Sequence, residues 1–209
     1  GREVFLELVA RADVVLESDR PGRMTARGLG WETLHAKNPR LILSSLTPFG
    51  QTGPYADWRA SDLTAIAMSG NLHCTGDPDR APVRCAMPVS YYHGGIEASV
   101  GVAFALLARE RTGRGQNVDI AMLDSVTALL TYQAGIYFAT GRAPSRMGNR
   151  HPTIVPYDTF PASDGEFVLA VGNDDQWRRF CRVAELPEDE RFATNRQRVT
   201  AYAALKPLL

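Results

Sequence analysis

Short apolar runs alternate along this chain with segments of helical periodicity. Residues 14–16 and 40–46 are rich in Val, Leu and Ile, while residues 4–9 and 30–34 repeat apolar side chains at helical spacing. A third strand candidate, residues 117–121, follows a long helical segment. Helices that alternate with strands in this way are typical of parallel sheets, because a helical crossover returns the chain to the same edge. The sequence therefore predicts an α/β fold.

Two long segments are apolar on more than one side. Residues 94–110 place Ile96 on one helical face and Ala98 on the other, and residues 122–140 form a second, nearly all-apolar helix. A helix that is hydrophobic all round is usually buried. We expect both helices to be deeply buried, with neighbours on every side.

The remaining elements are marked by capping residues and turns. Ser61-Asp62 is placed to cap a helix that runs to Ser69-Gly70, and residues 71–88 are predicted to be irregular. A strand at residues 166–171 leads into a helix that begins near Asn173. Gly and Pro punctuate residues 141–160, which marks a linker.

Charge and length narrow the classes of partner. The 23 lysine and arginine residues balance 23 aspartate and glutamate residues, and no basic run stands out. Neither a nucleic acid nor an anionic membrane is therefore an expected partner. No apolar run approaches the length of about 20 residues that spans a bilayer. This composition favours a small molecule.

Cysteine and histidine usage argues against metal and disulfide sites. Cys74, Cys85 and Cys181 have no CxxC spacing, and the four histidines are too dispersed for a metal-ligand pattern, so we expect no metal. HExxH, GxSxG and Walker phosphate-loop motifs are also missing from the sequence. We expect a reducing, cytoplasmic location. The chain opens and closes within helical patterns, so we expect it to continue at both ends in a longer protein.

Five blocks occur in an order that resembles one family. They are Ala12-Asp13-Val14-Val15-Leu16-Glu17 with Arg20-Pro21-Gly22, Asn38-Pro39-Arg40-Leu41-Ile42, Phe49-Gly50-Gln51-Thr52-Gly53-Pro54-Tyr55, Arg111-Thr112-Gly113-Arg114-Gly115-Gln116 and Met147-Gly148-Asn149-Arg150-His151-Pro152. With them the chain resembles the class III CoA-transferases, which include formyl-CoA and carnitine CoA-transferases and the α-methylacyl-CoA racemases.

The resemblance implies a particular architecture. The chain would be the central part of a class III CoA-transferase fold, with a Rossmann-like large domain and an interlocked dimer in the full-length family. Residues 1–140 would be the partial α/β core of the large domain. Residues 141–209 would be the linker and the start of the small domain.

The resemblance also implies a site for coenzyme A, as the acyl-CoA substrate. Its phosphates need guanidinium or ammonium donors on loops at the carboxyl ends of strands, and Arg20 follows the first strand candidate. Relatives commonly read Asn-Phe-Arg where this chain reads Ser18-Asp19-Arg20, and Arg27 could offset the added acid. Phe49-Gly50 matches a loop that approaches the pantetheine arm.

At the catalytic position this chain departs from the family. In the family an aspartate just before a buried helix attacks the acyl-CoA thioester, and the matching residue here is Tyr91. A phenol ionises near pH 10 and an aspartate near pH 4, so the exchange weakens the usual nucleophile. His93 as a base and Glu97 as a carboxylate are possible substitutes. The racemase branch pairs a histidine with an aspartate, of which only the aspartate is kept, as Asp62.

Three functions remain open on these residues. The first is transfer of CoA between an acyl-CoA and a small carboxylic acid, with Tyr91, Asp62 and His93 as candidate catalytic residues. The second is a non-catalytic subunit that pairs with an active paralogue. The third is a racemase-like or isomerase-like enzyme. We expect a homodimer for the first function and a hetero-oligomer for the second.

Overall fold

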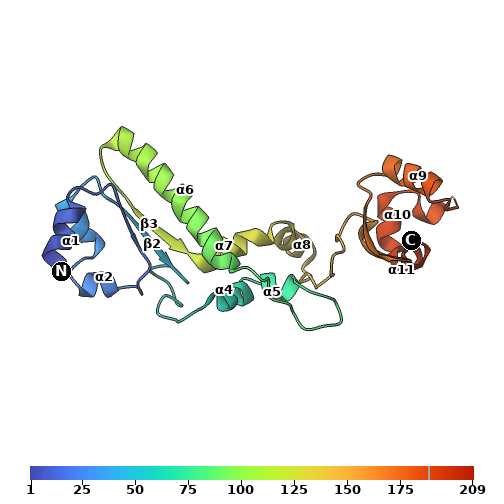
Figure 1. The fold of residues 1–209 in the computed structure, drawn as a ribbon, viewed down its shortest axis with the longest axis horizontal. Coiled ribbons are helices and arrows are strands. Elements are labelled where there is room, and N and C mark those ends of the chain that lie inside the picture. Colours follow the sequence, from blue (N-terminus) through green and yellow to red (C-terminus); the bar gives the residue numbers. More distant parts are fainter. Residues whose placement is uncertain (188) are drawn as a thin grey trace. The chain divides into compact units, whose positions relative to one another are not determined.

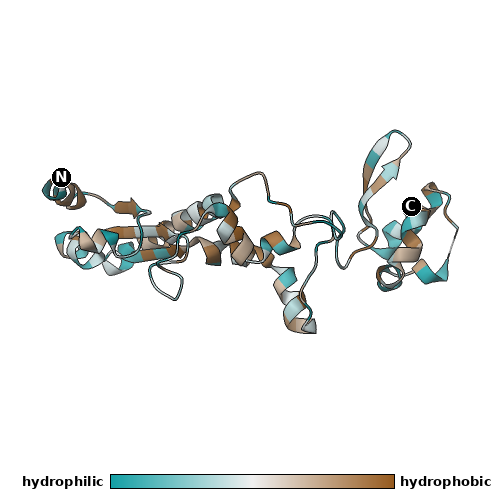
Figure 2. Ribbon diagram, turned by 90° about the horizontal axis from the view of Figure 1, so that it is seen from below, coloured by the Kyte–Doolittle hydropathy of each residue, from teal (hydrophilic) through white to brown (hydrophobic). Residues whose placement is uncertain are grey.

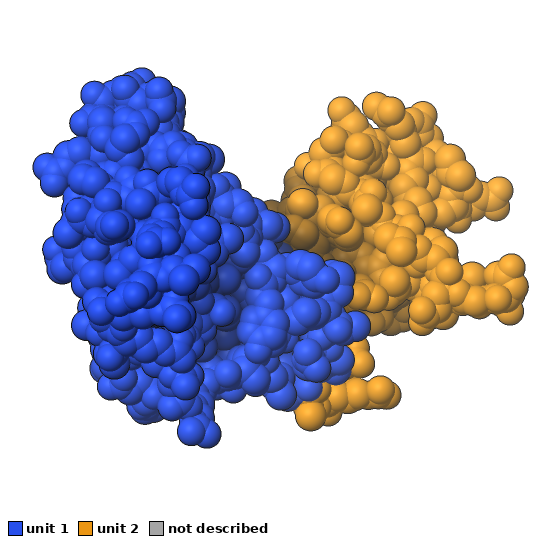
Figure 3. Space-filling model, turned by 60° about the vertical axis from the view of Figure 1, so that its left-hand side comes forward, with its two compact units in different colours: residues 1–75, 82–145 blue, residues 76–81, 146–209 orange. Residues whose placement is uncertain are grey.

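The computed structural model describes residues 1–187 and 189–209, which form two compact units. Unit 1 comprises residues 1–75 and 82–145, and unit 2 comprises residues 76–81 and 146–209 (Figure 3). The sequence indicated one boundary near residue 140, but no pattern indicated that residues 76–81 join the second unit. Assignment of the units to the large and small domains of the family stays a prediction.

A three-stranded sheet forms the centre of unit 1 (Figure 1). Its strands lie in the order β1 (Val14–Glu17), β2 (Ile42–Thr47) and β3 (Asn117–Ala121). Both pairings are parallel, with Val14 beside Ile42 and Leu43 beside Asn117. The predicted α/β fold with a parallel sheet is therefore confirmed.

Some of the helices of unit 1 pack on the two faces of this sheet. The helices of unit 1 are α1 (Arg2–Val9), α2 (Arg23–Ala26), α3 (Trp31–Lys37), α4 (Asp62–Met68), α5 (Asn71–Cys74), α6 (Val89–Thr112), α7 (Met122–Thr127), the 3₁₀ helix η1 (Ala128–Leu130) and α8 (Tyr132–Thr140). Val9 of α1 and Leu34 of α3 pack with Leu43 on one face. Leu46 points the other way, toward Gly94 of α6. Alternate residues of a strand face opposite sides, so β2 contributes to both layers.

A close approach of two backbones sets the entry into β3. A Cβ atom on Gly115 would lie 1.7 Å from the carbonyl oxygen of Leu41, so only glycine fits there. The Gly115 N–H donates to the Pro39 carbonyl at 2.9 Å. The turn at residues 112–116 thus brings β3 directly against β2.

Helix α6 differs from its prediction in start and in burial. It begins at Val89 rather than near Gly94, so Tyr91 lies within its first turn. Deep burial on all sides is wrong for this chain, since Ile96 is 60% and Phe104 67% exposed. The reason is that small residues face the sheet: a Cβ on Gly101 would lie 2.7 Å from Cγ1 of Val118. Larger apolar residues therefore point outward, and Figure 2 shows the hydropathy along the helices.

The predicted single helix at residues 122–140 is also wrong. It breaks at Thr131, whose φ of 41° ends η1 and precedes α8. The Val126 carbonyl, near the end of α7, accepts a hydrogen bond of 2.6 Å from the Asn71 side chain. Asn71 begins α5, a short helix inside the stretch that the sequence indicated as irregular. Phe138 of α8 is 82% exposed, so this segment is not buried as expected.

Unit 2 combines an antiparallel hairpin with short helices. Its elements are β4 (Tyr157–Ala162), β5 (Gly165–Ala170), α9 (Asp174–Val183), η2 (Glu190–Phe192), α10 (Asn195–Thr200), α11 (Tyr202–Leu205) and η3 (Lys206–Leu208). Strand β5 and the helix that begins near Asn173 were predicted, and the Asn173 side chain caps this helix. Strand β4 was not predicted, and Pro161 weakens its strand pattern. Among the described residues of both units, no helix has the length and apolar content needed to cross a bilayer.

A fully buried arginine links the helices of unit 2. The guanidinium of Arg198 donates to the carbonyls of Val155 (2.7 Å) and Phe192 (3.0 Å), and to Oδ1 of Asp174 (2.8 Å). The hydrogen bond from Arg198 holds the pKa of Asp174 below its usual value of 3.8. A depressed carboxyl pKa stabilises the fold above the unfolded-state pKa, and this contribution is lost as the pH falls through the folded-state pKa.

Asp174→Asn is expected to lower the melting temperature at pH 7 and to reduce the further loss on acidification to pH 3. The neutral amide cannot lose the ionised pairing with Arg198. Thermal melts followed by circular dichroism at both pH values measure the effect, with Asp164→Asn in the hairpin turn as the control. An equal fall in melting temperature between pH 7 and pH 3 in wild type and Asp174→Asn would contradict the stabilising role of the ionised Asp174–Arg198 pair.

Candidate active site

Two loops meet at the carboxyl edge of the parallel sheet. One follows β1 and the other follows β2, and together they line a cavity of about 320 Å³. Its lining residues are Ser18, Asp19, Arg20, Pro21, Pro48, Ala56, Trp58, Arg59 and Ala60. The structure thus places the predicted Arg20 in this cavity and adds a second arginine, Arg59.

Asp19 is the acidic residue of the loop that follows β1, and nearby arginines pair with it. Arg27 approaches its Oδ2 at 2.8 Å and Arg23 approaches its Oδ1 at 3.5 Å. Arg27 is therefore occupied by Asp19 and does not line the cavity. Arg20 keeps its charge for a ligand, and the loop has a net positive charge.

Phe49 and Gly50 belong to the second loop and influence its conformation. Phe49 is buried, and its ring lies 5.9 Å from that of Tyr55 and 6.4 Å, edge-on, from that of Trp58. Gly50 has a φ of 81°, which most residues avoid, and the next N–H, of Gln51, donates to Asp119 at 3.0 Å. Neither predicted residue lines the cavity, so both act through the shape of the loop.

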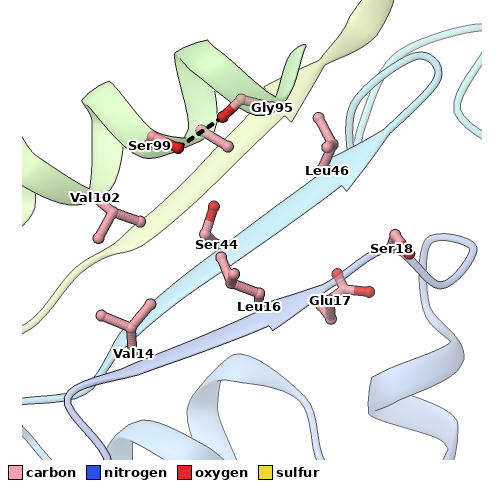
Figure 4. Close-up of a pocket in the computed structure, with 10 residues that line it drawn as sticks. Val14, Leu16, Glu17, Ser18, Ser44, Leu46, Gly95, Ser99 and Val102 are labelled. Carbon is pink, nitrogen blue, oxygen red and sulfur yellow. Dashed lines mark hydrogen bonds between the residues drawn. The ribbon is translucent and has the colours of Figure 1, made fainter. Parts of the chain in front are cut away.

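A larger hollow, of about 580 Å³, lies between the sheet and α6 (Figure 4). Val14, Leu16 and Leu46 form its sheet side, and Gly95 and Val102 belong to its helix side. The Ser99 hydroxyl points back along α6 and donates to the Gly95 carbonyl at 2.9 Å. This lining suits apolar groups better than phosphates.

Tyr91 and Asp62, which are far apart in the sequence, meet at the start of α6. The Tyr91 hydroxyl accepts a hydrogen bond of 3.2 Å from the backbone N–H of Asp62. The cap of α4 is Ser61, which forms a capping box with Thr64. Asp62 is therefore the first helical residue, which corrects its interpretation as the cap.

The Asp62 carboxylate is buried and bonded on both oxygens. Only 4% of the residue is exposed. Oδ1 accepts from the N–H (2.9 Å) and the hydroxyl (2.8 Å) of Ser90, and Oδ2 faces Nη2 of Arg84 at 3.3 Å. A buried charge needs such partners. Asp62 thus joins α4, the segment before α6 and α6 itself, and is poorly placed to act as a nucleophile.

His93 and Glu97 form a separate contact on α6. Nε2 of His93 lies 3.5 Å from Oε1 of Glu97, and Oε2 of Glu97 accepts a hydrogen bond of 2.5 Å from the Ser125 hydroxyl. Side chains two residues apart on a helix do not face each other. Within residues 1–187 and 189–209 no hydrogen bond joins His93 to Tyr91. The structure therefore does not bring the predicted base to the predicted nucleophile position.

Arg84 and Ser90 are the members of this cluster that the sequence did not indicate. Arg84 lies 22 residues from Asp62 along the chain, in a stretch without periodicity. The described residues contain no group of three or more His, Cys, Asp or Glu side chains that could hold a metal ion. The cluster is thus built from one carboxylate, one guanidinium and hydroxyl groups.

An α/β sheet with arginines at its carboxyl edge is typical of proteins that bind nucleotides. All of the chain, residues 1–209, matches the model of CoA-transferase family III. The chain therefore belongs to this family, and the resemblance found in the sequence is confirmed.

Known relatives are similar over the whole chain. Acetyl-CoA:oxalate CoA-transferase of Acetobacter aceti is 44% identical over 100% of this chain and 54% of its own length. Succinate–glutarate CoA-transferase of Agrobacterium fabrum strain C58 is 41% identical over 100% of this chain and 53% of its own length. A crystal structure of a CaiB/BaiF family protein from Brucella suis superposes with a TM-score of 0.83 at 43% identity, over 100% of this chain and 56% of that one. The chain spans about half the length of the relatives it matches.

Asp62→Ala is expected to destabilise unit 1 by about 2–4 kcal/mol, because the buried N–H and hydroxyl of Ser90 lose their acceptor. Asp62→Asn keeps an acceptor oxygen and should cost less. Urea unfolding measures both, and Asp57→Ala, on an exposed residue, is the control and should stay within about 0.5 kcal/mol of wild type. A loss no larger than that of the control would contradict the structural role of Asp62.

Proposed function

We propose that this chain is part of an enzyme that transfers CoA from an acyl-CoA to a carboxylic acid. Membership of CoA-transferase family III supports the reaction class. The proposed position of the CoA site is supported by one observation, the cavity that Arg20 and Arg59 line at the carboxyl ends of β1 and β2. Guanidinium groups pair well with phosphates, and ligands of α/β proteins bind outside the carboxyl ends of the strands.

Dicarboxylic acids are the acids that we propose as substrates. The two relatives described above are named for oxalate, succinate and glutarate, each of which carries two carboxyl groups. Both relatives are more than 40% identical to this chain and match all of it. We carry over this class of acid, and not the individual acid.

The proposed chemistry has to account for Tyr91. A neutral phenol is a weaker nucleophile than a carboxylate, and the neighbouring Asp62 is buried and bonded on both oxygens. We therefore propose that the acceptor acid supplies the attacking carboxylate. The Tyr91 hydroxyl, which accepts from the Asp62 N–H, still has its own hydrogen to donate to the developing oxyanion.

Direct transfer of this kind needs no acylated side chain. A carboxylate oxygen of the acceptor attacks the thioester carbonyl, the C–S bond breaks, and CoA leaves as a thiolate. The product is a mixed anhydride of the two acids. The thiolate then attacks the acceptor carbonyl of this anhydride, the C–O bond breaks, and the donor acid leaves as a carboxylate. Atoms and charge balance without an added reactant or a net proton transfer.

Tyr91→Asp is expected to open a covalent route, because it restores the carboxylate that relatives are expected to have at this position. In the full-length protein, succinyl-CoA should acylate the variant, and hydroxylamine should convert the adduct to an aspartyl hydroxamate that mass spectrometry detects. We expect CoA exchange to rise by about tenfold or more. Wild type should yield no hydroxamate.

The neighbouring substitution Tyr92→Asp is the matched control, since it adds the same carboxylate to an exposed residue. It should neither acquire an acyl group nor gain exchange. Acylation of a wild-type side chain would contradict direct transfer. Absence of exchange in both wild type and Tyr91→Asp, for oxalate, succinate and glutarate, would contradict the proposed enzyme.

Arg20→Gln is expected to weaken CoA binding by about tenfold, the usual scale for one charge-assisted hydrogen bond. Isothermal titration of CoA into the full-length protein measures the affinity without requiring turnover. Arg111→Gln, at the end of α6, removes an equivalent charge away from the cavity and should leave the affinity unchanged. An unchanged affinity in Arg20→Gln would show that the nucleotide end of CoA binds at another site.

The replacement of a carboxylate by Tyr91 also favours a second function, that of a non-catalytic subunit. Tyr91 and the buried Asp62 leave no accessible carboxylate in the described cluster, as expected of a non-catalytic subunit that binds CoA beside an active paralogue. Co-expression with such a paralogue tests this alternative. Stable association, with exchange that depends on the paralogue alone, would favour it. The homodimer and the cytoplasmic location stay predictions.

A further inference from the structure

Arg84 is held in the Asp62 cluster by its neighbours in the chain. Val83 and Cys85, on either side of it, line a separate small cavity of about 130 Å³ beside α4 and α7. The Val83 N–H donates to the Thr75 carbonyl at 3.0 Å, which ties this segment down. Arg84 turns instead to Asp62, so its guanidinium lies at the start of α6.

The guanidinium is oriented by Asp62 but mostly uncommitted. Its contact with Asp62 joins one nitrogen, Nη2, to Oδ2 at 3.3 Å, while Ser90 occupies Oδ1. The Arg84 side chain is 50% exposed. A guanidinium carries several N–H donors in a rigid, planar fork that matches a carboxylate. Within the described part of the chain, no other ion pair or hydrogen bond is seen for Arg84.

Arg84 and Tyr91 flank the same residue. The Tyr91 hydroxyl contacts the backbone of Asp62, and Arg84 contacts its side chain. The two groups are therefore separated by no more than one residue and two hydrogen bonds. This arrangement offers a short dicarboxylic acid a donor for each carboxylate, the Tyr91 hydroxyl for one and the Arg84 guanidinium for the other.

We propose that Arg84 binds the non-reacting carboxylate of a dicarboxylic acceptor and thereby sets the preference for such acids. This inference rests on the proposed function, because it takes the reacting carboxylate to lie at Tyr91. A carboxylate in the fork forms charge-assisted hydrogen bonds, whereas a monocarboxylic acid leaves the fork in water. Selectivity follows from that difference rather than from the size of the acid.

Arg84→Gln tests the inference through selectivity in the full-length protein. We expect kcat/KM for succinate to fall by about tenfold or more relative to kcat/KM for acetate, mainly through KM of the acid, because only succinate has a second carboxylate for the guanidinium. Arg84→Lys keeps the charge but loses the fork, so it should fall between wild type and Arg84→Gln. Arg111→Gln is the control and should retain the selectivity of wild type.

Direct binding separates a failure of this inference from a failure of the proposed function. Succinate is titrated calorimetrically in the presence of saturating CoA, after thermal melts have shown which of the two Arg84 variants is folded. Weaker succinate binding in the folded variant, with unchanged CoA affinity, supports the inference even if wild type shows no exchange. Unchanged succinate binding, or absence of succinate binding to wild type, overturns it, and so does unchanged selectivity in an active enzyme.

Discussion

Parallel pairing of β2 with a strand on each side is the constraint on which unit 1 depends. Most of this strand is buried, and its two faces meet different helices. Because both partners run in the same direction as β2, all three carboxyl ends lie at one edge. Loops that are separate in the sequence, around Arg20 and Trp58, therefore share one cavity. The approach of Gly115 to the backbone of Leu41 is what allows β3 to join.

The second constraint is the buried carboxylate of Asp62. Removing a carboxylate from water is costly unless its oxygens find donors, and Ser90 and Arg84 supply them. The same bonds that satisfy Asp62 hold the start of α6, and with it Tyr91, in place. They also reduce the freedom of Asp62 to attack a substrate. Burial and hydrogen bonding of Asp62 stabilise the fold, whereas attack on a substrate would need a free, accessible carboxylate. In this structure Asp62 is buried and bonded.

The composition of α6 explains why its apolar pattern is ambiguous. Gly94 and Gly101 face the sheet, because only small residues allow the close approach of α6 to Leu46 and Val118. Large residues such as Phe104 then point away from the sheet of this chain. Periodicity reports that both sides are apolar, but it cannot tell which side meets the sheet. That choice depends on side-chain volume at the contact.

The sequence by itself determined the three parallel strands, the helix starts at Ser61-Asp62 and near Asn173, and the family with its tyrosine at position 91. These follow from local periodicity, from side chains that cap the next turn, and from ordered motifs. The tertiary structure alone decided the break at Thr131, the pairing of β4 with β5, and the contact of Arg84 with Asp62. The contact of Arg84 with Asp62 joins residues 22 positions apart, and local patterns carry no information about which distant groups meet. Thr131 and Pro161 lie in segments whose own residue patterns point to a different structure, a continuous helix and a non-strand segment. His93 and Tyr91 are two residues apart in the sequence, but side chains at this spacing on a helix do not face each other.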